Sequence, residues 1–375
     1  MSKVARISRY FADDKDICDL ISQGAVTSSK LTEVLRQRGT FVSSETSKEN
    51  LITYFQRLQF SWPQLADFLE ILDRPEREDR FTNCRIDASS KALTIDATIT
   101  AMEKVKAERG AKYNEIYKIN KIDDKSAVLT VEYVEADFSK TRLRQKDEKT
   151  LNFRVDITKT GIQVRHQAAG RGHEIMNDVE QHLQPSDDSP PPTRREIIVT
   201  GLGSEQRSKF FIELARGIEG YNLSDQHGLR VDKPKDDVNE DDDDDTDNPH
   251  LEKQGRVNRA VLEGDSLLSS AEYQDYSKRG YSVSRLGWIA EAENKTLGIV
   301  EFSAEFQNGP DGTGFKYGVL GKWDVKKDGE LAKTRRAVTP AEKNRLLKLI
   351  EESAYRALDK VSSEKLELPP KEEAP

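Results

Sequence analysis

Five side chains between Lys30 and Leu58 are of the types that proteins use to bind phosphate groups. Four of them are cationic, and the fifth is a serine placed where a helix is expected to begin: Arg36, Arg38, Lys48, Arg57 and Ser47. Cations neutralise phosphates, and the free backbone N–H groups at a helix N-terminus point towards an anion. Five basic residues oppose three acidic ones in this stretch. The pattern predicts phosphate contacts of the kind made to nucleic acids.

The elements that carry these side chains are expected to be two short amphipathic helices joined by an extended link. The first helix has one apolar face, the link turns at Gly39, and the second helix begins at Ser or Thr; the apolar positions are Leu31, Val34 and Leu35, then Leu51, Ile52, Phe55 and Leu58. Phe41 and Val42 of the link are expected to pack between the helices.

This layout resembles the SAP fold, a small nucleic-acid-binding motif, over residues 30–58 only. The resemblance implies binding through a basic edge and a helix N-terminus. The alternative interpretation is a plain helical hairpin that packs against another domain or protein.

A second basic group lies in a predicted hairpin loop and comprises Lys140, Arg142, Arg144 and Lys146, followed by Lys149. Together with Arg154, Arg165 and Arg171 it can form a phosphate-binding patch. The alternative is a charged, solvated hairpin, because Asp147 and Glu148 interrupt the basic run.

The charge of the chain is concentrated in one tract. Residues 232–252 hold eleven acidic residues and two lysines, a net charge of −9, whereas the 375-residue chain as a whole carries −8. The remainder is therefore close to neutral. Solvated disorder is the favoured interpretation of the tract, over an EF-hand-like metal site, which would require glycine where Thr246 stands. A further hypothesis is that the tract competes with nucleic acid for a basic surface.

Catalytic patterns are weak. Glu291 and Glu301 on adjacent predicted strands, with Asp265, faintly resemble the acidic ligands of metal-dependent nucleases, but the lysine of that pattern is missing. His166, His173 and His182 lack metal-ligand spacing, and the turn Thr200–Ser204 is expected to be a strand-to-helix turn capped by Ser204. We predict no catalytic residue, metal or cofactor.

The predicted fold class is α+β with several domains. The expected parts are a helical SAP-like module (1–80), an antiparallel β-rich domain (81–185), a Pro-rich linker (186–193), an α+β domain (194–362) and a disordered tail (363–375). In the β-rich domain, Leu93–Ile99 is expected to be a strand. The C-terminal domain is expected to be of βαβ type, with duplication as one interpretation because Gly220-Tyr221 and Gly280-Tyr281 follow its helices, and to carry the acidic loop 232–252.

The sequence shows no apolar run long enough to span a membrane and no apolar signal-peptide core, so a cytoplasmic protein without membrane association is expected. Its predicted function is a non-catalytic nucleic-acid-binding adaptor or sensor subunit that works with a catalytic protein partner. DNA is the favoured nucleic acid, and bacterial genome defence is one compatible setting. The alternatives are a protein–protein scaffold whose acidic tract mimics DNA, and a divergent metal-dependent nuclease.

Overall fold

The computed structural model describes most of the chain: residues 13–22, 26–72, 80–87, 94–139, 141–158, 161–183, 193–234, 257–294, 297–326 and 329–367. Three predicted features therefore lie wholly or mostly outside the described residues: Lys140, the linker up to Pro192, and the acidic tract from residue 235 onwards.

The chain divides into two compact units. Unit 1 comprises Met1–Arg77, Asp96–Phe153 and Asp178–His182, and unit 2 comprises Glu78–Ile95, Arg154–Asn177 and Leu183–Pro375. The division falls inside strand β4 and helix α6, so both elements contribute residues to both units.

Unit 1 combines a helical module with a β-hairpin and a long helix. Its elements are α1 (Asp14–Ser22), α2 (Ser28–Gln37), α3 (Lys48–Gln56), α4 (Trp62–Leu72), α5 (Ile95–Tyr113), β2 (Ile116–Lys121), β3 (Ser126–Ala136), the 3-10 turn η2 (Arg142–Arg144) and the first part of β4 (Lys146–Ile157). β2 and β3 pair antiparallel, as the turn residues 123–126 predict.

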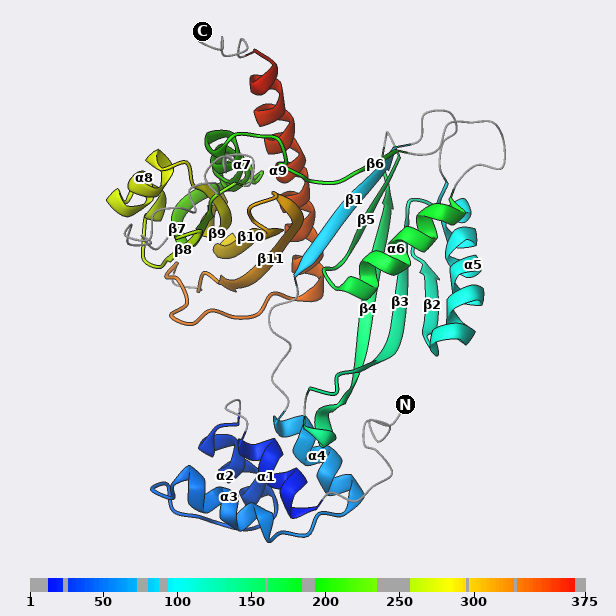
Figure 1. The fold of residues 1–375 in the computed structure, drawn as a ribbon, viewed down its shortest axis with the longest axis vertical. Helices are drawn as coiled ribbons and strands as arrows, with labels where there is room; N and C mark the ends of the chain where they lie inside the picture. The colour runs from blue at the N-terminus through cyan, green and yellow to red at the C-terminus, as the bar shows by residue number, and fades with distance from the viewer. Residues whose placement is uncertain are drawn as a thin grey trace, which may run out of the picture. The chain divides into compact units, whose positions relative to one another are not determined.

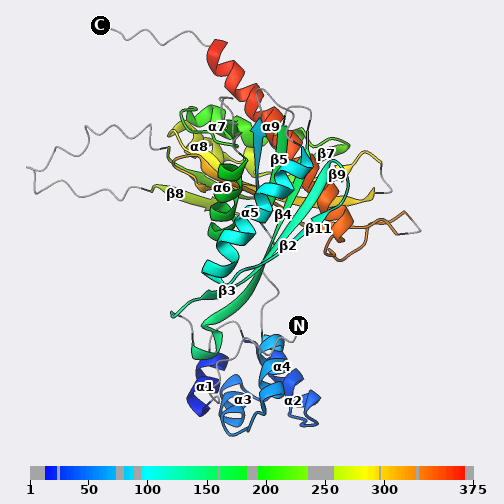
Figure 2. The ribbon, with the colours of Figure 1, turned by 90° about the vertical axis from the view of Figure 1, so that its right-hand side faces the viewer.

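Helices α1 to α4 form a helical module (Figures 1 and 2). This module has its own hydrophobic core. The apolar faces predicted for the SAP-like helices are confirmed, since Leu31, Leu35 and Phe55 are fully buried and their neighbours pack against them. Phe41 is a correction: its side chain is 83% exposed, whereas Val42 packs on the core. Of these two link residues, only Val42 therefore contributes to the hydrophobic core of the module.

The predicted strand at Leu93–Ile99 is wrong, because helix α5 begins at Ile95. Alternating Ile and Thr residues imitate a strand there, but the buried positions have helical spacing: Ile95, Thr98, Met102, Val105 and Arg109. Burial at intervals of three and four residues stabilises a helix regardless of the short alternating stretch.

Unit 2 is built on an antiparallel sheet. Its elements are β1 (Phe81–Asp87), the end of β4, β5 (Gly161–Gln167), most of α6 (Gly170–His182), β6 (Thr193–Arg195), α7 (Ser204–Arg216), β7 (Tyr221–Asp232), β8 (Arg259–Leu262), the 3-10 turn η5 (Leu267–Ser269), α8 (Ala271–Lys278), β9 (Ser282–Ala292), β10 (Ile299–Asn308), β11 (Thr313–Trp323) and α9 (Pro340–Glu367). The strand order is β5-β1-β11-β10-β9-β7-β8, with β6 pairing β1.

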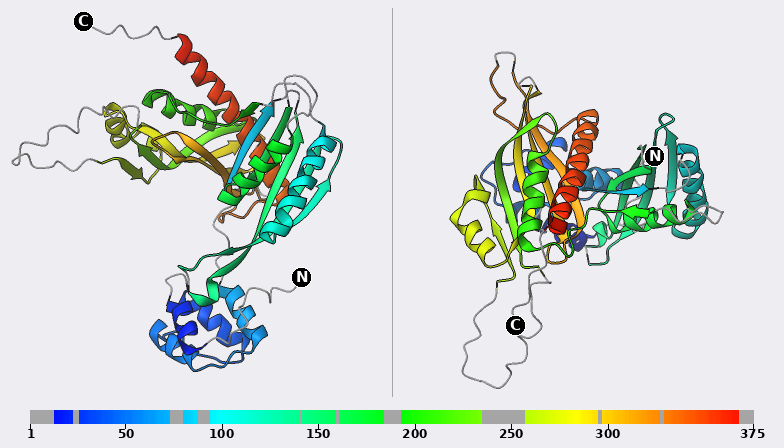
Figure 3. Two further views of the ribbon diagram at one scale, coloured as in Figure 1. Left: turned by 45° about the vertical axis from the view of Figure 1, so that its right-hand side comes forward. Right: turned by 90° about the horizontal axis from the view of Figure 1, so that it is seen from above.

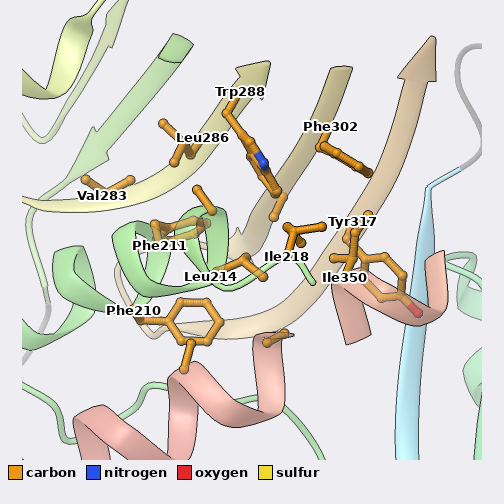
Figure 4. Close-up of a cluster of buried hydrophobic side chains, with 14 of the residues drawn as sticks. Phe210, Phe211, Leu214, Ile218, Val283, Leu286, Trp288, Phe302, Tyr317 and Ile350 are labelled. Carbon is orange, nitrogen blue, oxygen red and sulfur yellow. The ribbon is translucent and has the colours of Figure 1, made fainter. Parts of the chain in front are cut away.

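Helices α7 and α9 pack on one face of this sheet (Figure 3). Figure 4 shows the core between these helices and the sheet, which contains Phe210 and Leu214 of α7, Ile350 of α9, and Trp288 and Phe302 of the sheet. The indole of Trp288 stacks on Phe302 with 5.6 Å between ring centroids. One face of α7 and one face of α9 are thereby buried in the core of unit 2.

The two predicted half-units of this domain are not equivalent. β8 and β9 both run antiparallel to β7, so β8, α8 and β9 form a βαβ unit split by an antiparallel strand. β6 instead pairs with β1, far from β7 in the strand order. The Gly-Tyr pairs are a shared local feature: Gly220 and Gly280 have φ of +75° and +82°, and a buried tyrosine follows each.

Three boundaries differ from prediction. Gly203, not Ser204, is the N-cap of α7. The strand predicted over residues 195–200 is wrong, because β6 ends at Arg195 and residues 196–200 are not in a strand; Ile197 and Val199 are nevertheless buried in the core. Helix α9 continues to Glu367, into the predicted disordered tail, where the Lys209–Glu364 ion pair of 2.7 Å attaches it to α7.

Candidate nucleic-acid interface

The ends of α2 and α3 place the predicted phosphate-binding side chains. Ser47 caps α3, and its Oγ accepts a hydrogen bond from the Asn50 N–H at 3.3 Å. Gly39 has φ of +74° and its N–H donates to the Arg36 carbonyl, so it ends α2 as a left-handed residue. The predicted turn at Gly39 and the helix start at Ser are confirmed.

Arg38 joins the C-terminal ends of the two helices. Its Nη2 donates to the Gln59 carbonyl at 3.0 Å, and its guanidinium lies 4.7 Å from the centroid of the Phe60 ring. Because Gln59 follows the α3 C-cap Arg57 by two residues, the ends of α2 and α3 converge. Arg38 is therefore a structural residue that holds this junction.

Arg36, Arg38 and Arg57 lie at the C-terminal ends of these two converging helices, and we call these three residues the arginine edge. Arg36 and Arg57 are exposed; the Arg36 side chain is 63% accessible and pairs with Glu33 one turn earlier. The C-terminal carbonyls of a helix favour cations, so the edge also complements two helix dipoles. Two exposed guanidinium groups remain accessible to an external anion.

Ser47 and Lys48 lie at the opposite end of α3. Nine residues at about 1.5 Å each separate the helix ends by roughly 13 Å. Lys48 is half-buried at the first helical position. The five predicted residues therefore form two groups, not one continuous surface.

One member of the second predicted basic group, Arg142, contributes to the packing of unit 1. Leu143 in the turn η2 is buried in the core of the helical module, and Arg142 donates to the buried carboxylate of Asp16 at 3.1 Å. Lys146 is exposed at the start of β4. The side chain of Arg144 and the whole of Lys140 lie outside the part of the chain that the structure describes. These contacts join the β3–β4 hairpin to the helices.

The acidic residues that the nuclease hypothesis would use as metal ligands are either hydrogen-bonded to other side chains or exposed. Glu301 accepts a hydrogen bond from His227 Nε2 at 2.9 Å and a second from Arg335. These partners lower the pKa of Glu301 despite its burial, while Glu301 raises the pKa of His227. Glu291 is exposed on the adjacent strand β9. No group of three or more His, Cys, Asp or Glu side chains is placed to hold a metal ion within the described ranges.

Of the clustered histidines, His166 lies in the interior of unit 2, and the half-buried His173 lies beside it. His166 is 2% exposed, and its ring lies edge-on to His173 with 5.2 Å between centroids. Its Nδ1 lies 2.8 Å from the Gln167 carbonyl, which can only accept, so Nδ1 carries the proton. Burial lowers the pKa of His166 to about 4, so the ring is neutral at pH 7.

Two functional candidates were missed at the level of sequence. Arg345 and Lys348 of α9 line one cavity together with Arg154 and Arg165, which belong to the predicted basic group. In the sequence Arg345 and Lys348 are two cations three residues apart on the side of α9 opposite its apolar stripe, a pattern that by itself indicates a solvated helix face. Arg171, another member of the predicted basic group, does not line this cavity and pairs with Glu174.

No family model matches the chain, and no curated protein matches it in sequence. Among the described helices, none has the length and apolar character needed to cross a bilayer.

Proposed function

We propose that this chain is a nucleic-acid-binding adaptor whose arginine edge contacts the phosphate backbone. The observation that carries the proposal is the convergence of α2 and α3, which presents Arg36 and Arg57 from two helices at one exposed edge. Phosphate contacts of this kind fix a protein on a nucleic acid without reading its sequence. Chemistry on the bound nucleic acid is left to a partner protein.

Phe41 supports the same proposal. Its 83% exposed ring follows the arginine edge by three residues along the chain. Exposed aromatic rings beside cations act as stacking platforms for unpaired bases, with about 1–3 kcal/mol per stacked base. The closeness of Phe41 to the arginine edge along the chain therefore favours a single strand, or a duplex end, as the ligand over a continuous duplex.

The test uses the full chain with labelled single-stranded and duplex DNA and single-stranded RNA between 50 and 200 mM salt. Two phosphate contacts, from Arg36 and Arg57, should give a slope of log affinity against log salt of about −2 with a duplex and about −1.4 with a single strand. We expect R36E/R57E to weaken binding at least tenfold at the lowest salt. The charge-matched control K104E/K125E changes two exposed lysines of the same unit and should bind as the native chain does.

Two outcomes contradict the proposal. The first is an absence of binding at low salt by both the native chain and a variant lacking residues 234–250, in which the acidic tract can no longer compete. The second is an equal loss of affinity in R36E/R57E and in the control. Phe41→Ala should weaken single-strand binding more than duplex binding, and the reverse order would exclude stacking.

A further inference from the structure

A cavity of about 180 Å³ lies inside unit 2 against helix α9. It is lined by residues from three separate segments of the chain: Arg154 and Asp156 of β4, Arg165 of β5, and Asn344, Arg345 and Lys348 of α9. Four of these six residues are cations and one is an anion. We call it the α9 cavity.

The floor of the α9 cavity is a buried, hydrogen-bonded ion pair. Arg165 is 5% exposed and forms two hydrogen bonds with Glu351, which is 1% exposed. Glu351 also accepts hydrogen bonds from Gln163 and from the Tyr317 hydroxyl. Each carboxylate oxygen therefore has two donors, and Glu351 has little capacity left to neutralise another cation.

The mouth of the cavity carries the charge excess. Arg154 is neutralised by Asp156 at 3.0 Å, and Arg165 by Glu351. Arg345 has a long hydrogen bond of 3.5 Å to the Tyr221 hydroxyl, and Lys348 lies 4.0 Å from Glu352. Two cations are thus weakly compensated beside a buried guanidinium.

The placement of Arg345 and Lys348 is not required by the core. The buried stripe of α9 uses Leu346, Leu347 and Ile350, so the two cations lie off that stripe. They are three residues apart, a spacing at which side chains on a helix are neighbours and like charges repel. A bound anion between them would relieve this repulsion.

The size of the cavity limits the ligand. A water molecule takes about 30 Å³ of liquid, so the α9 cavity has the volume of roughly six waters. A tetrahedral phosphate group fits this space, whereas a whole nucleotide does not. Arginine and lysine together are typical ligands of phosphate oxygens, and two weakly compensated cations match the two charges of a phosphate monoester.

We propose that the α9 cavity binds a phosphate monoester group, with the remainder of the ligand outside the mouth formed by Asn344, Arg345 and Lys348. The group can belong to a free mononucleotide or to the 5′-phosphorylated end of a nucleic-acid strand. The inference uses residues of unit 2 alone, and it does not depend on the arginine edge.

Calorimetric titration of the full chain tests the proposal with four probes: inorganic phosphate, a nucleoside 5′-monophosphate, a 5′-phosphorylated oligonucleotide and its 5′-hydroxyl twin. The variant R345Q/K348Q should bind phosphate at least tenfold more weakly than the native chain. Its control, R216Q/K278Q, removes one exposed arginine and one exposed lysine from α7 and α8 and should leave phosphate binding unchanged.

The probes also identify the source of the group. If the 5′-phosphorylated strand binds more tightly than its 5′-hydroxyl twin, and R345Q/K348Q lacks this preference, the cavity binds strand ends. If phosphate and the mononucleotide bind but the two strands bind equally, the cavity binds a free ligand. Absence of binding for every phosphorylated probe, or equal binding by R345Q/K348Q, overturns the proposal. R36E/R57E should retain phosphate binding, which separates failure here from failure of the arginine edge.

Discussion

The arginine edge and the α9 cavity collect cations in opposite ways. At the edge, Arg36, Arg38 and Arg57 lie within 22 residues of one another, and two of the three are exposed. In the cavity, Arg154 and Arg165 of the consecutive strands β4 and β5 meet Arg345 of α9, which lies 180 residues further along the chain than Arg165. They meet over a buried ion pair. An edge of this kind can be read from a local motif, whereas a cavity of this kind requires the fold.

The difference also separates binding from stability. Exposed cations at helix ends contribute little to folding, since solvent screens them. A buried guanidinium and carboxylate must remain paired, because removing either one leaves a desolvated charge. Substitutions should therefore affect the fold strongly at the cavity floor and weakly at the arginine edge.

The largest expected effect is at the cavity floor. Glu351→Ala leaves Arg165 buried without its carboxylate and should destabilise unit 2 by about 3–5 kcal/mol. Denaturant unfolding followed by the fluorescence of buried Trp288 measures the change. Glu352→Ala, at the next and more exposed position, should cost less than about 0.5 kcal/mol, and equal costs would refute a buried pair.

The second effect concerns His166, which follows Arg165 on β5. Its pKa of about 4 in the folded chain lies below the ordinary 6.5, so the unfolded chain takes up the proton first as the pH falls. Stability should therefore decrease by about 3 kcal/mol between pH 6.5 and 4. His166→Gln, which stays neutral, should lack this part of the pH dependence in unfolding curves. His173 is shifted in the same direction, so some dependence should remain.

The third effect tests what holds the helical module that carries the arginine edge. Leu143→Ala removes a buried side chain from the core of that module and should cost about 2–3 kcal/mol. Val134→Ala, at a 50% exposed position on β3, is the matched control. Limited proteolysis within residues 26–72 should accelerate only in the first variant, and unchanged protection would show that η2 does not support the module.

The smallest effect on stability is expected at the arginine edge itself. Arg36→Ala with Arg57→Ala should change the unfolding free energy by less than about 0.5 kcal/mol. The same double variant should reduce the slope of log affinity against log salt by about 2. A large loss of stability would instead identify the edge as a structural cap of the two helices.

Local sequence signals succeeded where the relevant interactions are short-range. The apolar faces of α2, α3, α7 and α9, the turn at Gly39 and the hairpin at residues 123–126 all follow from side-chain spacing and turn chemistry. They failed at α5, where Ile95 to Ile99 alternate like a strand, because the burial that decides the helix extends to Arg109.

The candidate sites were predictable to different degrees for the same reason. Arg36, Arg38 and Arg57 were found because their helices are adjacent in sequence. Arg154 and Arg165 were found only as members of a charged group, and their partners Arg345 and Lys348 were missed. Nothing local in α9 shows that it faces β4 and β5.

The sequence by itself determined where most helices and strands form and which of their faces are apolar, because hydrogen bonding and burial within one element depend on neighbouring residues. Only the tertiary structure decided which charged side chains form internal hydrogen bonds and ion pairs. It committed Arg38, Arg142 and Glu301 to internal partners and brought Arg345 and Lys348 to a buried arginine. The reason is physical: a desolvated charge must be paired, and the partner it finds is set by the fold, not by its distance along the chain.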